Sequence, residues 1–226
     1  MSQTSSSIQQ TISRHLLQYY APKRKALSSR FPIFKKPIIG TRRFIQNTKN
    51  RLDKTIARQK SNTFFECVVA RHQSVLLRKL GDSDIRLQQQ KITNLRIAAM
   101  HLNGLIIHPG QVFSLWNTVG KPCKRRGFVP GMLLANGKVV EGVGGGLCQM
   151  SNLLHWLFLH VPVTVEERYH HSMDVFPDSG RILPFGSGAT ILYNFVDLKI
   201  KNVSPYPLQL KVWLTKTHLK AQIVSL

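Results

Sequence analysis

The sequence predicts an α+β fold, in which a mainly antiparallel sheet packs against a few helices and a basic N-terminal arm precedes them. Hydrophobic residues make up 42% of the 226-residue chain and charged residues 19%, which is enough apolar material for one packed core. Short β-branched runs alternate with turn residues through the second half, and two longer stretches repeat apolar residues at helical spacing. We expect residues 1–60 to form the arm and residues 61–226 the domain.

The arm stands out by its charge. Residues 1–60 hold 14 of the 32 Lys and Arg of the chain and one acid, Asp53. Pro32, Pro37 and Gly40 interrupt this segment, so we expect it to be solvated and partly disordered. A formal net charge of +22 predicts a polyanionic partner. The alternative to a free arm is a segment that docks on an anionic membrane surface, where each basic residue contributes about 1 kcal/mol.

The sequence pattern predicts where the chain acts. The N-terminal residues lack the basic region, apolar run and small-residue cleavage site of a signal peptide, and nowhere do about 18 apolar residues follow one another. We therefore expect a cytoplasmic protein or one peripheral to the cytoplasmic membrane. Nucleic acid is the weaker candidate partner, because the basic residues concentrate in the arm and no recognised binding motif accompanies them.

Three cysteines, Cys67, Cys123 and Cys148, form an odd and widely spaced set. Because no CxxC pair occurs, we expect neither a structural zinc site nor a disulfide scaffold. We expect no metal and no cofactor.

The elements of the domain follow from local patterns. The β-branched segment 64–77 predicts a strand, and apolar residues at helical spacing over 92–102 predict a helix that stops at Asn103-Gly104. Residues 108–116 read as a turn and a strand, and Asn136-Gly137 between two apolar runs predicts a hairpin over 127–140.

The remaining elements complete the sheet. A helix is expected from Cys148 to His160, because Pro162 cannot continue it. The segment 163–172 alternates as a strand and places Val163, Val165 and His171 on the side expected to face the core. The tail holds three or four strands, with breaks at 202–207 and 215–217. Sequential strands with short connections are typical of an antiparallel sheet.

The segment GVGGGLCQMSN (142–152) carries the most information about function. Consecutive glycines are costly to order, so they are expected where the backbone takes unusual dihedral angles or a ligand comes close. A helix that begins directly afterwards places Cys148 in its first turn, where unpaired N–H groups favour negative charge and should lower the thiol pKa. The backbone N–H groups of Cys148 and Gln149, with the Gln149 side chain, are candidate donors to an oxyanion.

A nucleophilic cysteine needs a base, and we expect His171 to supply it, since the Pro162 turn returns the strand alongside the helix. His155 shares the helix face of Cys148 but lies about 10 Å away at 1.5 Å per residue, too far for direct proton transfer. Structural interpretations stay open for both members of this pair. A cysteine before an apolar helix is often a small buried hydrophobe, and an inward histidine is often a satisfied core residue.

We expect the surroundings of this pair to bind substrate. The candidate substrate-binding residues are Gly144, Gly145, Gly146, Ser151, Asn152 and Arg168.

The segments GLIIHPGQVFSLWNTVG, GGGLCQMSNLLHWLFLHVPVTVEERYHHS and VDLKIKNVSPYPLQLKVWL together resemble the VanW family, from about Ile92 to the C-terminus. The resemblance implies a link to glycopeptide (vancomycin) resistance and peptidoglycan. Some proteins with this domain are regarded as cysteine-dependent peptidoglycan L,D-transpeptidases. Their nucleophile in the pattern GGGxCQ matches Cys148, and the family histidine matches His171. Where the family usually carries an acid in G-x-D-A-T, this chain has Gly188. If that acid orients the histidine, this chain has either lost some activity or uses another group, such as Asp174 or Asp178.

Two functions follow from these expectations. The first is a cell-envelope protein in which Cys148 and His171 carry out acyl transfer, L,D-transpeptidase-like, on peptidoglycan peptides, with Gln149 stabilising the oxyanion. The alternative is a non-catalytic module at the membrane surface that binds a muropeptide or a lipid-linked precursor. The absence of an acid at Gly188 favours the alternative.

Overall fold

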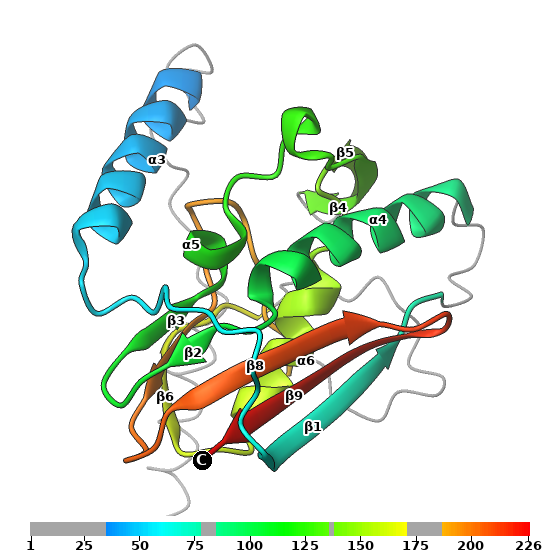
Figure 1. The fold of residues 1–226 in the computed structure, drawn as a ribbon. Coiled ribbons are helices and arrows are strands. Elements are labelled where there is room, and N and C mark those ends of the chain that lie inside the picture. Colours follow the sequence, from blue (N-terminus) through cyan, green and yellow to red (C-terminus); the bar gives the residue numbers. More distant parts are fainter. Residues whose placement is uncertain (1–34, 78–84, 136–137, 171–186) are drawn as a thin grey trace, which may run out of the picture. The chain divides into compact units, whose positions relative to one another are not determined.

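The computed structural model describes residues 35–77, 85–135, 138–170 and 187–226 (Figure 1). The chain divides into two units, Met1–Thr41 and Arg42–Leu226, and the second holds the sheets and the core. Residues 42–60, assigned to the arm on sequence grounds, therefore belong to the second unit. His171, Asp174 and Asp178 lie outside the described residues.

A helix that the sequence pattern did not predict, α3, spans Lys35–Leu52. Pro37 is compatible with it, because the N–H groups of a first helical turn have no partner within the helix. Tertiary bonds also hold the helix: Asn47 Oδ1 accepts from Tyr193 Oη at 3.2 Å and from Asn194 Nδ2 at 2.5 Å. This part of the arm is therefore helical, although no helix was expected in it.

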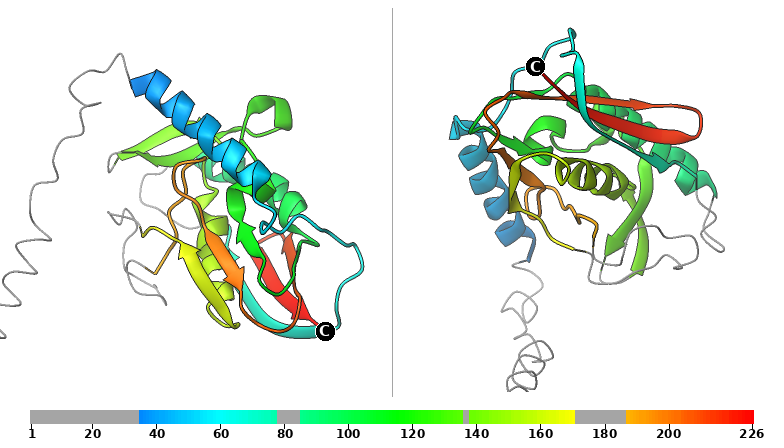
Figure 2. Two further views of the ribbon diagram at one scale, coloured as in Figure 1. Left: turned by 90° about the vertical axis from the view of Figure 1, so that its left-hand side faces the viewer. Right: turned by 90° about the horizontal axis from the view of Figure 1, so that it is seen from below.

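The strands confirm a mainly antiparallel α+β fold (Figures 1 and 2). A four-stranded sheet has the order β1-β9-β8-β2, made by Cys67–Val75, His218–Ser225, Leu208–Leu214 and Ile106–Ile107. A three-stranded sheet has the order β3-β7-β6, made by Val112–Ser114, Lys199–Asn202 and Val163–Glu167. The expected hairpin is present as β4 (Pro130–Ala135) and β5 (Lys138–Val143).

Three helices accompany these strands: α4 (Ile85–Leu102), α5 (Leu115–Val119) and α6 (Cys148–Phe158). The helices α4 and α6 were expected, whereas α5 falls where a strand alone was predicted. None of the helices within the described ranges is long and apolar enough to cross a bilayer.

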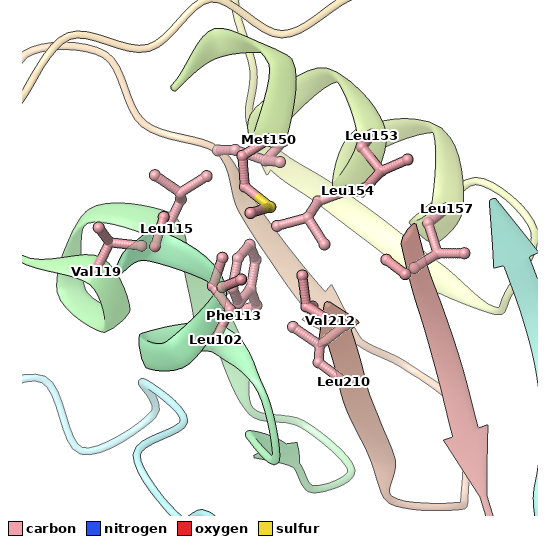
Figure 3. Close-up of a cluster of buried hydrophobic side chains, with 14 of the residues drawn as sticks. Leu102, Phe113, Leu115, Val119, Met150, Leu153, Leu154, Leu157, Leu210 and Val212 are labelled. Atoms are coloured by element: carbon pink, nitrogen blue, oxygen red, sulfur yellow. The ribbon is translucent and has the colours of Figure 1, made fainter. Parts of the chain in front are cut away.

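The core forms where α4 and α6 pack against the four-stranded sheet. Its buried face comes from alternate residues of β8, among them Leu210 and Val212, which pair with Ile223 and Ala221 of β9. Figure 3 shows Met150, Leu153, Leu154 and Leu157 of α6 directed towards this cluster. Phe158 extends the core to the second sheet, since its ring lies 5.2 Å from that of Phe113 on β3.

Strand β6 departs from the expected alternation. A register shift between Val165 and Glu167 breaks the period of two, so the side predicted to face the core does not stay there. Val163 packs against the core, but Val165, which precedes the shift, is already 38% exposed, and Tyr169, which follows it, is 54% exposed. Strand β6 therefore does not keep the alternation from which the inward direction of His171 was inferred. The direction of His171, which lies outside the described residues, stays a prediction.

One buried amide fixes the glycine-rich loop to the rest of the unit. Asn94 on α4 is fully buried, and its Nδ2 donates to Gly145 O at 2.9 Å and to Val129 O at 3.0 Å. Its Oδ1 accepts from Val129 N at 2.9 Å. A single buried side chain thus satisfies three backbone groups on two segments, and one of these groups, Gly145 O, is in a fully buried bond.

Replacing Asn94 by Ala should lower the free energy of unfolding by about 3 kcal/mol, because Gly145 O and both backbone groups of Val129 would lose their partner. Urea unfolding followed by circular dichroism measures this. The control is Met100→Ala on the same helix, whose side chain is 69% exposed and whose loss should cost little. Equal unfolding midpoints for the two variants would contradict the role assigned to Asn94.

A buried carboxyl group organises the start of α5. Asp197 Oδ1 accepts from the backbone N–H groups of Trp116 and Leu198, and Ser114 Oγ donates to its Oδ2 at 2.6 Å. Ser114 Oγ in turn accepts from Asn117 N, which caps the helix. Burial, aided by the negative charge of Glu167, raises the pKa of Asp197 to about 6, although the hydrogen bonds oppose this rise.

The raised pKa of Asp197 predicts a pH-dependent stability. Below the ordinary value of 3.8 the folded and unfolded chains both hold the proton. As pH rises towards about 6 the unfolded chain releases it first, so this contribution to stability is lost over that interval. The loss amounts to roughly 3 kcal/mol at 1.36 kcal/mol per pKa unit.

Asp197→Asn removes this titration. The free energy of unfolding of the variant, relative to that of the unmodified chain, should therefore increase as the pH rises from 4 to 7. Urea unfolding at several pH values measures the difference, with the exposed Glu66→Gln as the matched control. Parallel stability curves for Asp197→Asn and the unmodified chain would refute the assignment.

Candidate functional site

A pocket of about 220 Å³ opens beside the start of α6 and includes Cys148 in its wall. Its apolar lining comes from Leu133, Val143, Leu147, Ile191 and Leu192. Two aromatic residues, Trp116 and Tyr193, meet edge to face with ring centroids 5.5 Å apart. Arg43 from α3 and Lys121 add positive charge. The wall thus combines a thiol, aromatic rings and two cations.

Two backbone N–H groups, that of Ile191 and that of Cys148 itself, act on the Cys148 thiol. The residue keeps part of its surface exposed, and it packs against the hydrophobic core on its other side. Both N–H groups favour a thiolate, since hydrogen bonds to a charged form stabilise it. The thiol is thus placed between the core and the pocket.

Burial nevertheless raises the pKa of the Cys148 thiol, and the two hydrogen bonds do not offset it. The expected lowering of this pKa was therefore wrong. Its basis was a set of free N–H groups at the helix start. In the structure the N–H groups of Gln149, Met150 and Ser151 already donate to carbonyls of the preceding loop. The desolvation of the thiol then dominates.

Gln149 is also engaged elsewhere. Its side-chain Nε2 donates to Ser74 Oγ at 2.9 Å and to Val75 O at 2.7 Å on β1. Its backbone N–H donates to Gly146 O at 3.1 Å. Both groups assigned to an oxyanion therefore bind other parts of the chain in this structure. The oxyanion role of Gln149 stays a prediction that needs these bonds to open.

The packing of the chain itself requires the glycine run. Gly145 lies so close to β4 that a Cβ on it would stand 2.0 Å from the carbonyl carbon of Gly131. Gly146 has φ +89°, and a Cβ there would meet the Lys91 side chain. Unusual dihedral angles and a close approach were both expected, but the approaching group is the chain's own β4. Of the three glycines, Gly144 is the one that lines the pocket. It is therefore the glycine that a molecule in the pocket would contact.

The other candidate substrate-binding residues hold one segment, 187–189, against α6. Ser151 Oγ donates to Ala189 O at 2.6 Å, and Asn152 Oδ1 accepts from Ala189 N at 2.7 Å. Arg168 donates through Nε and Nη2 to Gly188 O, at 3.0 and 2.8 Å. These bonds position the neighbouring Ile191, whose N–H reaches Cys148. Contact with substrate stays a prediction for Ser151, Asn152 and Arg168.

Position 188 has little room for an acid. A Cβ on Gly188 would lie 2.8 Å from Asn152 Oδ1, so an aspartate there requires this amide to shift. The departure from the family pattern therefore coincides with a close contact to Asn152 in this chain.

The structure describes His155 and His170 but not His171. His155 is buried, and its Nδ1 lies 3.0 Å from Ser187 O. Burial and the nearby positive charge of Arg168 lower the pKa of His155, which favours its neutral form. His170 is exposed. The pairing of His171 with Cys148 concerns a residue outside the described ranges and stays a prediction.

Sequence reasoning missed the residues that give the pocket its character. Arg43 and Lys121 were counted only as basic residues of the arm and of a connecting segment, and Trp116 and Tyr193 carried no motif. The segment GQVFSLW did contain Trp116, but nothing local linked it to Cys148.

The described part of the arm presents an apolar and basic surface. On α3, Phe44 is 71% exposed and Leu52 is 74% exposed, and the exposed Lys49 and Arg51 lie in its last turn. Docking of residues 1–60 on an anionic membrane stays a prediction.

The chain is similar to known proteins over the part that forms this pocket. The family model described as "VanW like protein" matches residues 90–224. The Vancomycin B-type resistance protein VanW of Enterococcus faecalis (strain ATCC 700802 / V583) is 40% identical over 142 residues, which cover 63% of this chain and 52% of that protein. The Uncharacterized protein YoaR of Bacillus subtilis (strain 168) is 25% identical over 118 residues, which cover 52% of this chain and 37% of that protein.

The chain therefore spans about half the length, or less, of these curated relatives. No solved structure matches the chain. The family match includes Cys148, the glycine run before it and most of the pocket wall, but not Arg43. Because the match covers more than half of the residues, this chain belongs to the VanW family.

Proposed function

We propose that this chain is a cell-envelope protein of glycopeptide resistance that binds a peptidoglycan-type peptide in the Cys148 pocket. The observation that carries the proposal is the pocket itself, in which apolar walls, two aromatic residues and two cations surround one thiol. A concave, mostly apolar site with a few polar groups is the usual form of a small-ligand site. The named function of the Enterococcus faecalis relative supports the link to resistance.

The surroundings of Cys148 and Gln149 support ligand binding more than they support catalysis. The Cys148 thiol has a raised pKa, and the donors of Gln149 are engaged by β1 and by the glycine loop. A site that binds needs neither a thiolate nor an open oxyanion hole. Its shape and its charge suffice.

Filling the pocket should weaken peptide binding. Leu192 lines the pocket and is 53% exposed, so Leu192→Trp should block the entrance without unfolding the chain. We expect at least a tenfold rise in Kd for N-acetyl-L-Lys-D-Ala-D-Ala, measured by isothermal titration calorimetry. The control, Leu159→Trp, changes a residue of the same type that is 50% exposed at the far end of α6 and should leave Kd unchanged. A peptide that binds the Leu192 variant as tightly as the unmodified chain does not occupy this pocket.

A second function, cysteine-dependent acyl transfer of the L,D-transpeptidase type, is favoured by the two backbone N–H groups on the sulfur. In this proposal a bond forms between Sγ and the carbonyl carbon of the peptide while the C–N bond breaks, and the thiol proton passes to the leaving amine. An acceptor amine then takes the acyl group and returns a proton to Sγ. His171 would carry these protons as the general base and acid.

Alkylation kinetics separate the two functions. In a Cys67→Ser, Cys123→Ser variant, Cys148 is the single thiol. Because burial raises its pKa, we expect it to react with iodoacetamide more slowly than N-acetylcysteine at pH 7, and its rate to rise at higher pH than the rate of that free thiol. A faster reaction at neutral pH would show an activated thiolate and favour acyl transfer. The Cys148→Ala variant should retain peptide binding if binding alone is the function.

A further inference from the structure

Arg43 lines the Cys148 pocket and carries a side-chain donor without a partner among the described residues. Its Nε is buried, and no acceptor lies within hydrogen-bond distance of it among the residues that the structure describes. The guanidinium carbon lies 5.6 Å from the centre of the Phe195 ring, a cation–π distance that restrains the group without satisfying its N–H donors. Buried polar groups normally have a partner, so an absent acceptor is the simplest explanation of this arrangement.

The charged residues of the pocket indicate the charge of the missing acceptor. Arg43 and Lys121 both line it, and the described residues around it include no acid. An arginine binds carboxylates through paired N–H donors in a planar fork. The expected acceptor is therefore an anionic oxygen of a ligand.

The size of the pocket limits the ligand that brings this oxygen. At about 220 Å³ the pocket is smaller than the roughly 300–1,000 Å³ typical of sites for drug-sized molecules. The apolar side chains of Leu133, Val143 and Ile191 face the same space. A chain terminus with small side chains fits this volume, whereas a disaccharide or a diphosphate with its lipid requires more room.

We propose that Arg43, assisted by Lys121, binds the free C-terminal carboxylate of the peptide, whose small terminal side chains fill the apolar part of the Cys148 pocket. This inference rests on the proposed peptide binding and adds the group by which the peptide is recognised. It also gives helix α3 a role in the site, although α3 lies outside the part of the chain that matches the family.

The test compares two probes that differ in one group, N-acetyl-D-Ala-D-Ala with a free carboxylate and the same dipeptide as its C-terminal amide. Binding to the full chain is measured by isothermal titration calorimetry at low salt. We expect the acid to bind at least tenfold more tightly than the amide, because a charge-assisted hydrogen bond is worth that much. Arg43→Gln should remove the preference, and Arg43→Lys should restore part of it.

Two further variants keep the result interpretable. Lys121 is exposed, so Lys121→Gln should fold normally and lower the preference for the acid even if the Arg43 variants prove unstable. Lys49→Gln changes an equally charged and exposed residue of α3 and should leave the preference unchanged. Thermal unfolding of each variant checks that it is folded.

Each outcome decides between the possibilities. Equal binding of acid and amide would overturn the carboxylate inference and leave the proposed peptide binding in place. Absence of binding for both probes would contradict the peptide binding and the inference together. Arg43-dependent binding of inorganic phosphate, without a preference for the acid over the amide, would assign the subsite to a phosphate group and overturn the inference.

Discussion

The close passage of Gly145 over Gly131 sets the geometry of this part of the molecule. A side chain on Gly145 would stand 2.0 Å from the carbonyl carbon of the facing residue, so the two backbones meet with nothing between them. Asn94 secures this contact from α4 by binding Gly145 O and both backbone groups of Val129. The direction in which α6 starts, and with it the place of Cys148, depends on this crossing.

The glycine-rich segment 142–152 serves mainly to position one wall of the Cys148 pocket. The loop carbonyls take up the first N–H groups of α6, and Gln149 fastens the helix to β1. Ser151 and Asn152 hold the segment that brings Ile191 N–H to the sulfur. Because these polar groups bind other parts of the chain, burial dominates the surroundings of the thiol and raises its pKa. Positive charge reaches the pocket from Arg43 and Lys121 instead.

The opposite wall depends on a different buried group. Asp197 accepts from Trp116 N and from Ser114 Oγ, and so fixes the start of α5, from which Trp116 enters the pocket. The ring of Trp116 then meets Tyr193, whose hydroxyl donates to Asn47 on α3. One continuous set of contacts thus links a carboxyl group of the core to the helix that carries Arg43. The wall of the pocket and the stability of the fold therefore depend on the same residues.

Local pattern by itself determined α4, α6, the β4–β5 hairpin and the three tail strands, because periodicity and turn residues act within a few positions of the chain. It also singled out Cys148. Tertiary structure decided the rest. Helix α3 forms although Pro37 and Gly40 were expected to interrupt this segment. A bulge in β6 changes the direction of the residues after Val165. The Cys148 thiol is buried, whereas a helix start with free N–H groups was expected there. The reason is the same in each case: burial and close approach arise between segments far apart in the sequence, and no local pattern records which segments will meet.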